Sequence, residues 1–255
     1  AWLWTAGEAH IPVNGLRVRT LDCKTGEIEV SVRTSHPGPV SVDIFEADGA
    51  APVASACGQS QDGRAVFSLA IPGVKLWDCD SPNLYRCRAS FGGDETETTF
   101  GVRALAWGEG GLTINGERVI LRGACVHHDN GLLGACSFPE AEERRVRLLK
   151  ENGYNALRSS HYPCSKALLD ACDRLGMLMM DEYVDHWYIH KTKYDYVEHF
   201  MEWWRQDLKD MADKDFNHPC VIMYSTGNEV AETAQPKGIA LTGEMTRWLH
   251  GVDGT

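Results

Sequence analysis

Residues 220–230 read Cys-Val-Ile-Met-Tyr-Ser-Thr-Gly-Asn-Glu-Val, an apolar run that turns polar around a glycine. The uninterrupted run at 221–224 is typical of a parallel strand that helices cover on both faces. Such a strand ends near the glycine and brings Asn228 and Glu229 to its carboxyl end. Because the active site of an α/β barrel lies where its parallel strands end, Glu229 is the first candidate for a catalytic residue.

Length and composition restrict the class of protein. The chain has 255 residues, 43% of them hydrophobic, which is enough for one large domain or two of ordinary size. A net charge of −11 without a Lys/Arg cluster argues against nucleic acid as a partner. No window resembles a membrane span, and residues 1–10 lack the features of a signal peptide. Nine cysteines without repeated CxxC spacing favour free thiols, so we expect a cytoplasmic protein.

Before residue 105 the sequence consists of short segments in which apolar and polar residues alternate. Turn signals such as Asp48-Gly49 and Asp62-Gly63 separate them, and Gly92-Gly93 indicates a last hairpin. About seven strands in roughly 90 residues are typical of an immunoglobulin-like β-sandwich. The expected strands include residues 15–20, 27–33, 40–45, 65–69 and 84–89.

From residue 112 the pattern changes to strand followed by helix. Asn115-Gly116 predicts a hairpin, and Ser137 with Glu140 predicts a capping box ahead of the first outer helix. Four strand and helix units in succession predict the first half of a (β/α)8 TIM barrel, since a whole barrel takes about 250 residues. The expected strands are 122–128, 154–158, 177–180 and 221–224, and the expected helices are 144–152, 165–175, 194–215 and 239–249. A smaller open α/β sheet is an alternative, but no glycine-rich phosphate loop follows any of these strands.

Polar residues cluster at the four predicted strand ends. Adjacent His127 and His128 point to opposite faces of a strand, and the His-x-His spacing of a metal site is missing, so we expect no metal or other cofactor. Asp181 and Glu182 are also adjacent, so one should point into the barrel and the other should be a structural partner. The full set is His127, His128 and Asp129, residues 158–162, Asp181, Glu182, Asp185 and Trp187, and Asn228 and Glu229.

Several blocks resemble the successive signatures of glycoside hydrolase family 2, which contains β-galactosidases, β-glucuronidases and β-mannosidases. The blocks are Arg158-Ser-Ser-His-Tyr-Pro163, Asp170-Ala-Cys-Asp-Arg-Leu-Gly176, Met180-Asp-Glu182 and His218 to Glu229, and Trp77 to Tyr85 resembles the family's immunoglobulin-like domain. The resemblance covers residues 10–255 in the right order. It implies residues 1–9 as a remnant of a preceding jelly-roll domain, 10–104 as the sandwich, and 105–255 as the amino-terminal half of the barrel.

The resemblance implies a retaining glycosidase, in which two carboxyl groups lie about 5 to 5.5 Å apart. Glu229 matches the acid/base and Asn228 a donor to the sugar 2-hydroxyl. His127 and His161 resemble histidines that bind sugar hydroxyls, and Trp187 offers an apolar face for a pyranose. Asp129 and Asp181 complete the predicted substrate-binding set.

The family's nucleophile is a second Glu on a later strand, so we expect residues 1–255 to be an internal fragment that is inactive alone. A β-galactoside is the favoured carbohydrate substrate, and a homo-oligomer stays open. A non-catalytic carbohydrate-binding fragment of a degenerate hydrolase is the main alternative. An esterase is a further alternative, but the sequence lacks the Gly-x-Ser-x-Gly elbow of such enzymes.

Overall fold

The computed structural model describes residues 3–254, which form two compact units. The first unit runs to Ile120 and includes Asn217–Pro219, and the second contains Leu121–Phe216 and the residues from Cys220 onward. The sequence predicts the domain boundary at 104/105, and residues 105–120 belong to the first unit in this division. The predicted jelly-roll remnant begins at residues 1 and 2, which lie outside the described residues, and residues 3–6 form no strand.

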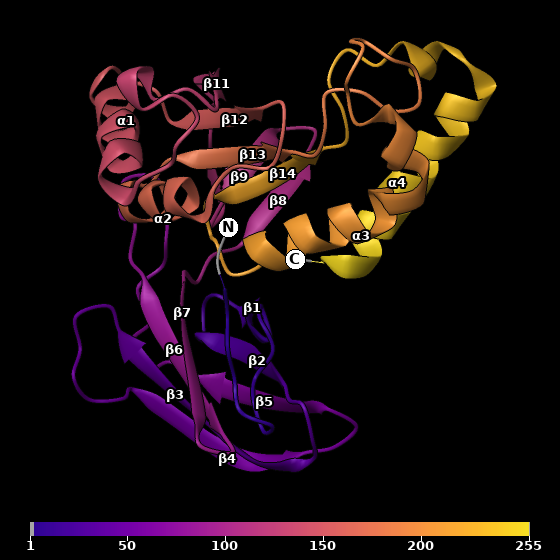
Figure 1. Cartoon of the computed structure of the whole chain (residues 1–255). Coiled ribbons are helices and arrows are strands. Elements are labelled where there is room, and N and C mark those ends of the chain that lie inside the picture. The colour runs from indigo at the N-terminus through magenta and orange to yellow at the C-terminus, as the bar shows by residue number, and fades with distance from the viewer. Residues whose placement is uncertain (1–2, 255) are drawn as a thin grey trace. The chain divides into compact units, whose positions relative to one another are not determined.

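The first unit contains a sandwich of two antiparallel sheets (Figure 1). One sheet has the order β1 (Leu16–Asp22), β2 (Glu27–Arg33), β5 (Arg64–Ala70), and the other has the order β4 (Ala54–Ser60), β3 (Gly38–Glu46), β6 (Tyr85–Phe91), β7 (Asp94–Phe100). The two-residue alternation places Val30 and Ile44, one from each sheet, in a common core. The sequence missed β4 because its residues, Ala-Ser-Ala-Cys-Gly-Gln-Ser, include no β-branched or aromatic side chain.

Three short strands complete this unit: β8 (Leu105–Gly108), β9 (Gly111–Ile114) and β10 (Glu117–Arg118). β9 and β10 pair antiparallel across Asn115 and Gly116, whose φ angles are 54° and 86°. Both turn residues therefore have positive φ, as a type I′ hairpin requires. The predicted Asn-Gly hairpin is confirmed.

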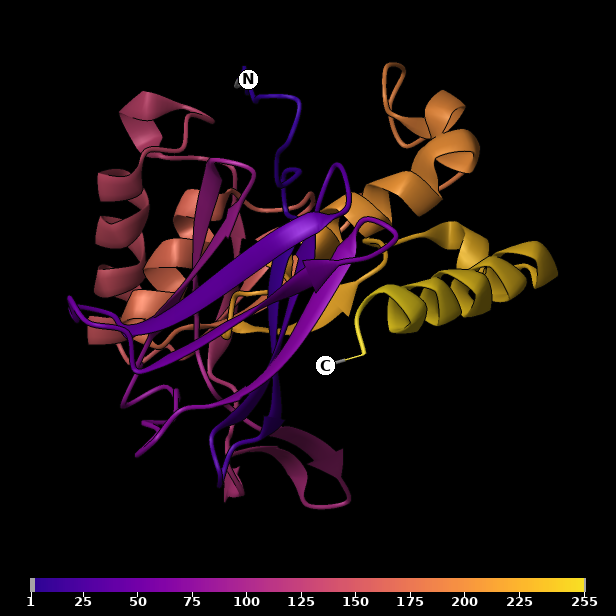
Figure 2. The same ribbon diagram turned by 90° about the horizontal axis from the view of Figure 1, so that it is seen from below.

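The second unit contains a parallel sheet in the order β11 (Gly123–His127), β12 (Ala156–Ser160), β13 (Leu178–Glu182), β14 (Val221–Ser225). A helix follows each strand, namely α1 (Pro139–Glu151), α2 (Lys166–Leu175), α3 (Val197–Asp215) and α4 (Pro236–Val252). Short 3-10 helices η1 (Gly131–Leu133) and η2 (Ala231–Ala234) lie in the connections. Helix α1 packs with α2 and α3 packs with α4, as both views show (Figures 1 and 2).

The helix ends test the predicted caps. Helix α2 ends at Gly176 in the left-handed region, directly after the predicted span 165–175, and Ser165 is its N-cap, accepting the amide of Leu168 at 3.1 Å. The predicted capping box of α1 is wrong. The N-cap is Phe138, so the Ser137 hydroxyl lies before the cap and donates to Glu142 Oε1 at 2.9 Å.

Helix α3 starts at Val197, three residues later than predicted. Phe200, Trp203, Trp204, Leu208 and Met211 recur at helical spacing, which predicts one packed face, and all of them except Trp203 are buried in a cluster with Leu241 and Met245 of α4. Trp203 differs from that prediction and is 45% exposed, because it lies about 100° around the helix from Trp204. No helix within residues 3–254 is long and apolar enough to cross a membrane.

Candidate active site

The strand register decides which side chains share a face of the parallel sheet. Cys125 of β11 lies opposite Arg158 of β12, and Glu182 of β13 lies opposite Ser225 of β14. Because side chains alternate along a strand, His127 and Ser160 occupy this same face two residues later. The face thus gathers polar groups from all four strands at their carboxyl ends.

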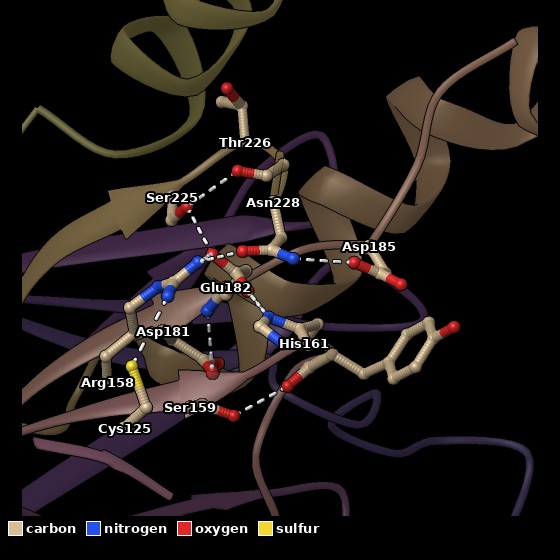
Figure 3. Close-up of polar contacts among 12 residues, drawn as sticks. Cys125, Arg158, Ser159, His161, Asp181, Glu182, Asp185, Ser225, Thr226 and Asn228 are labelled. Atoms are coloured by element: carbon tan, nitrogen blue, oxygen red, sulfur yellow. Dashed lines mark hydrogen bonds and ion pairs between the residues drawn. The ribbon is translucent and has the colours of Figure 1, made fainter. Parts of the chain in front are cut away.

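Glu182 is the centre of a hydrogen-bonded network (Figure 3). Its side chain is completely buried, and Oε2 accepts from Nε of Arg158 at 2.9 Å, from Nη2 of the same residue, and from Ser225 Oγ at 2.6 Å. His161 Nδ1 lies 2.8 Å from Oε1. A buried carboxylate needs a cation and further donors to offset its lost hydration, and Glu182 has both.

Asn228 extends the network across the end of β14. Its Oδ1 accepts from Arg158 Nη2 at 2.9 Å, and its Nδ2 donates to Asp185 Oδ1 at 2.8 Å (Figure 3). Lys191 Nζ donates to the same Asp185 oxygen at 2.9 Å and to the Asn228 carbonyl at 2.6 Å. Partial burial opposes the charge of Asp185, but the bonds from Asn228 and Lys191 hold its pKa below the usual value.

The two candidate histidines lie together. The rings of His127 and His161 meet edge to face with centroids 5.1 Å apart. His128 instead lies near the Pro163 carbonyl, with Nε2 3.3 Å from the oxygen, so the adjacent histidines separate as the sequence predicted. His161 therefore connects the network around Glu182 to His127.

Glu229 follows Asn228 directly. Its side chain is exposed, and among residues 3–254 its carboxylate makes no hydrogen bond or ion pair. The backbone at Glu229 has φ of 47°, a left-handed conformation that costs about 1 to 2 kcal/mol for a residue with a Cβ. Its free carboxylate contrasts with the fully bonded one of Glu182 and is available to exchange a proton with a ligand.

Asp181 does not join the network. It lies on the opposite face of β13, completely buried, where Oδ1 accepts the Cys164 amide at 2.9 Å and Oδ2 lies 3.2 Å from Lys214 Nζ. Burial would lower the pKa of Lys214, but Asp215 and Asp181 raise it above the usual value. The structure therefore places Asp181 away from the network, and Glu182 is the partner of Arg158.

Two further predicted substrate contacts also lie outside the network. Trp187 is only 1% exposed, stacks on Phe200 and donates from Nε1 to the Thr226 carbonyl at 2.8 Å, so it has no free face for a sugar ring. The Asp129 carboxylate is exposed and accepts the Gly131 amide at 2.9 Å. Trp187 supports the turn after β14 through its bond to Thr226, and the Asp129 side chain stabilises a local turn.

The predicted catalytic and substrate-binding residues do not include several members of the network. Arg158 and Glu182 were recognisable from their period-two positions at neighbouring strand ends, but they were treated only as structural partners. Lys191 had no signal, because it lies in the long connection between β13 and α3. The sequence shows no activating partner for Cys125 and indicates a small packing group, yet the side chain is exposed and accepts from Arg158 Nη1 at 3.3 Å. The Ser160 hydroxyl and the Arg158 guanidinium lower its pKa.

Strand β14 departs from its predicted environment. Val221 is buried, but Ile222 to Ser225 are only half-buried. In the part of the chain that the structure describes, β14 is an edge strand with β13 as its single neighbour, which leaves its outer side uncovered.

Comparison with known families assigns these two units. The profile of the "Glycosyl hydrolases family 2, TIM barrel domain" matches residues 106–255, and that of "Glycosyl hydrolases family 2" matches residues 9–103. The chain belongs to glycosyl hydrolase family 2. The resemblance inferred from the sequence blocks is thereby confirmed, and so is a sandwich followed by part of a TIM barrel.

Individual members of family 2 show the same relationship. The chain is 35% identical over 91% of its length to the β-galactosidase BoGH2A of Bacteroides ovatus, and 32% identical over 91% to a putative β-glucuronidase of Formosa agariphila. A solved family 2 member from Bacteroides cellulosilyticus superposes on 96% of the chain with a TM-score of 0.89 and 36% identity. The chain spans 29%, 23% and 34% of these three proteins, respectively.

Proposed function

We propose that these residues belong to a retaining β-glycosidase in which Glu229 is the general acid and base. The supporting observation is the position of Glu229, directly after an Asn228 whose side chain Arg158 and Asp185 hold at the carboxyl ends of the parallel strands. A retaining enzyme needs one carboxyl group that protonates the leaving oxygen and then deprotonates water. Glu229 has a free carboxylate for both steps.

The nucleophile is proposed to come from outside residues 1–255. Glu182 is fully buried and bonded to Arg158, His161 and Ser225, and Asp185 is bonded to Asn228 and Lys191. A nucleophile must reach the anomeric carbon with an unoccupied oxygen lone pair. Complete burial and three bonded partners argue against Glu182 in that role. Asp185 is the alternative within the chain, because only its Oδ1 is bonded, but the chain's 29% span of its β-galactosidase relative favours a nucleophile elsewhere in the full-length protein.

The proposed substrate is a terminal β-linked sugar, with a β-galactoside favoured because the Bacteroides ovatus relative is named a β-galactosidase. A β-glucuronide is the second candidate, since another relative is named a putative β-glucuronidase. Kinetics of the full-length protein on aryl β-galactosides and aryl β-glucuronides will distinguish them. A ratio of kcat/KM that favours the glucuronide would overturn the first choice.

Replacement of Glu229 tests the acid/base role. In the full-length protein, Glu229→Ala should remove most activity on a phenyl glycoside, whose leaving group needs protonation. A dinitrophenyl glycoside should still form the glycosyl enzyme, which then accumulates because no base activates water. Added azide should restore turnover on that substrate and yield the glycosyl azide, because azide attacks without a base.

The matched control is Glu140→Ala, which removes an exposed carboxylate from the first turn of α1. It should retain the activity of the unmodified protein on both substrates. Equal losses on the phenyl and dinitrophenyl glycosides in Glu229→Ala, without an azide effect, would show that Glu229 is structural.

A non-catalytic carbohydrate-binding role is the second candidate. The network supplies several sugar-binding groups, and the nucleophile is proposed to come from outside residues 1–255. Hydrolysis by the full-length protein would exclude it. We also propose a cytoplasmic location, which the nine free thiols support. A homo-oligomer stays a prediction, which light scattering on the full-length protein will test.

A further inference from the structure

The connection between β13 and α3 forms hydrogen bonds with the turn that carries Glu229. Trp187 donates to the Thr226 carbonyl at 2.8 Å, and Lys191 donates to the Asn228 carbonyl at 2.6 Å. Asp195 accepts a hydrogen bond from the backbone amide of Lys191 at 2.8 Å, which fixes the backbone from which the Lys191 side chain extends. The peptide group just before Glu229 is thus held by a cation from another loop.

The same loop determines which way the Asn228 amide points. An arginine can only donate hydrogen bonds and an ionised carboxylate can only accept them. Arg158 must therefore face Oδ1 of Asn228, and Asp185 must face Nδ2. The alternative orientation, with the oxygen and nitrogen exchanged, would lose both bonds and place like groups together.

This orientation leaves a defined group for a ligand. One hydrogen on Nδ2 is used by Asp185, and the second is free. Oδ1 already accepts a charge-assisted bond, which makes it a poorer partner for a further donor. Asn228 therefore presents one N–H to a bound molecule and recognises an acceptor oxygen.

We propose that Asp185 and Lys191 are positioning residues that fix the Asn228 amide and the Glu229 peptide, and so determine the preference for an acceptor oxygen on the carbon next to the anomeric centre. The inference rests on the proposed glycosidase function and deepens it. Asp185 acts on the amide nitrogen, and Lys191 acts on both the Asp185 carboxylate and the Asn228 carbonyl. Neither residue needs to touch the substrate.

The test compares aryl β-glycosides that carry or lack the 2-hydroxyl, using the full-length protein. Asp185→Ala removes the acceptor of Nδ2 and should lower the kcat/KM ratio of the 2-hydroxy over the 2-deoxy substrate by about tenfold. The loss should fall on kcat more than on KM if the contact strengthens in the transition state. Lys191→Met should lower the same ratio and also slow the 2-deoxy substrate, because it releases the Glu229 peptide as well.

Conservative variants separate positioning from general damage. Asp185→Asn keeps an oxygen where Asp185 Oδ1 accepts from both Asn228 and Lys191, so it should retain a larger part of the ratio than Asp185→Ala. Lys193→Met is the matched control for Lys191→Met, because Lys193 lies on the same loop with its ammonium 5.0 Å from the ring centroid of Tyr194. It should leave the ratio unchanged.

A crystal structure of Asp185→Ala provides a readout that does not depend on hydrolysis. The Asn228 side chain should rotate away from its position beside Arg158. An unchanged side chain together with an unchanged substrate ratio overturns the inference. If the unmodified protein cleaves no aryl glycoside, the proposed function fails, and the position of Asn228 in the variant alone decides whether Asp185 positions it.

Discussion

Arg158 connects three parts of the site. Its guanidinium donates to Glu182, to Asn228 and to Cys125, which come from three different segments of the chain. The planar fork of an arginine can make these bonds at once, whereas a lysine cannot match the geometry. One consequence concerns Cys125, because a cation beside a thiol favours the thiolate, which is the nucleophilic form.

We therefore predict that Cys125 is alkylated faster than Cys57, which is also exposed but lies in the sandwich. Because the pKa of Cys125 is lowered, its reactivity should persist at pH values below the usual thiol pKa of about 8.5. Arg158→Met should slow the reaction of Cys125 and leave that of Cys57 unchanged. Mass spectrometry after timed iodoacetamide pulses will measure both rates, and equal rates for the two thiols in the unmodified protein would contradict the prediction.

At the scale of elements, η2 ties the turn after β14 to the β13–α3 connection. Glu232 is only 2% exposed, and its Oε1 accepts the backbone amides of Tyr188 and Ile189, both at 2.8 Å. Gly238 of α4 packs so tightly here that an added Cβ would lie 1.9 Å from the Glu232 carbonyl oxygen. The buried Glu232 carboxylate thus holds the loop that carries Asp185 and Lys191, although it lies more than 40 residues later in the chain.

Glu232→Ala should lower the free energy of unfolding by about 2 kcal/mol, because two buried amides lose their acceptor. Hydrogen exchange at the amides of residues 188 and 189 should become faster. Glu244→Ala in α4 is the control, since Glu244 makes an exposed pair with Arg205 and should change stability by about 0.5 kcal/mol or less. Unchanged exchange at residues 188 and 189 in Glu232→Ala would show that other contacts hold the loop.

For the whole molecule, the network of bonds explains why we expect residues 1–255 to lack hydrolytic activity when produced alone. Glu182 is completely buried, and Asp185 is bonded through Oδ1 to Asn228 and Lys191, so we expect neither carboxylate to act as the nucleophile. In the described chain, β11 and β14 are the two edges of the parallel sheet. Exposed sheet edges pair with other chains.

The isolated polypeptide should therefore associate in solution and show no turnover of aryl glycosides. Light scattering and an activity assay on the purified chain will measure both properties. A monomer that turns over substrate, and loses that turnover in Glu229→Gln, would place a nucleophile within these residues and return Asp129, Glu182 and Asp185 to consideration.

Signals within short stretches of the sequence were sufficient to predict most of the helices and strands and the family. Two-residue alternation predicted most of the sandwich strands, apolar runs predicted the parallel strands, and the helix expected over 165–175 ends before Gly176, because each signal acts between residues close in the chain. Local signals gave the wrong result where tertiary packing determines the outcome. Ser137 is not the N-cap of α1, and Trp203 is exposed rather than buried. The local signals also placed Asn228 and Glu229 at a strand end, where the structure finds them.

The grouping of the polar residues depends on contacts between distant parts of the chain. The register of β13 turned Glu182 toward Arg158 and Asp181 toward Lys214, although the two carboxylates are adjacent and indistinguishable by composition. Lys191 reaches Asn228 across 37 positions of the chain. Long-range pairs of this kind arise from how strands align and loops fold back, so no pattern within a short window of sequence could have indicated them.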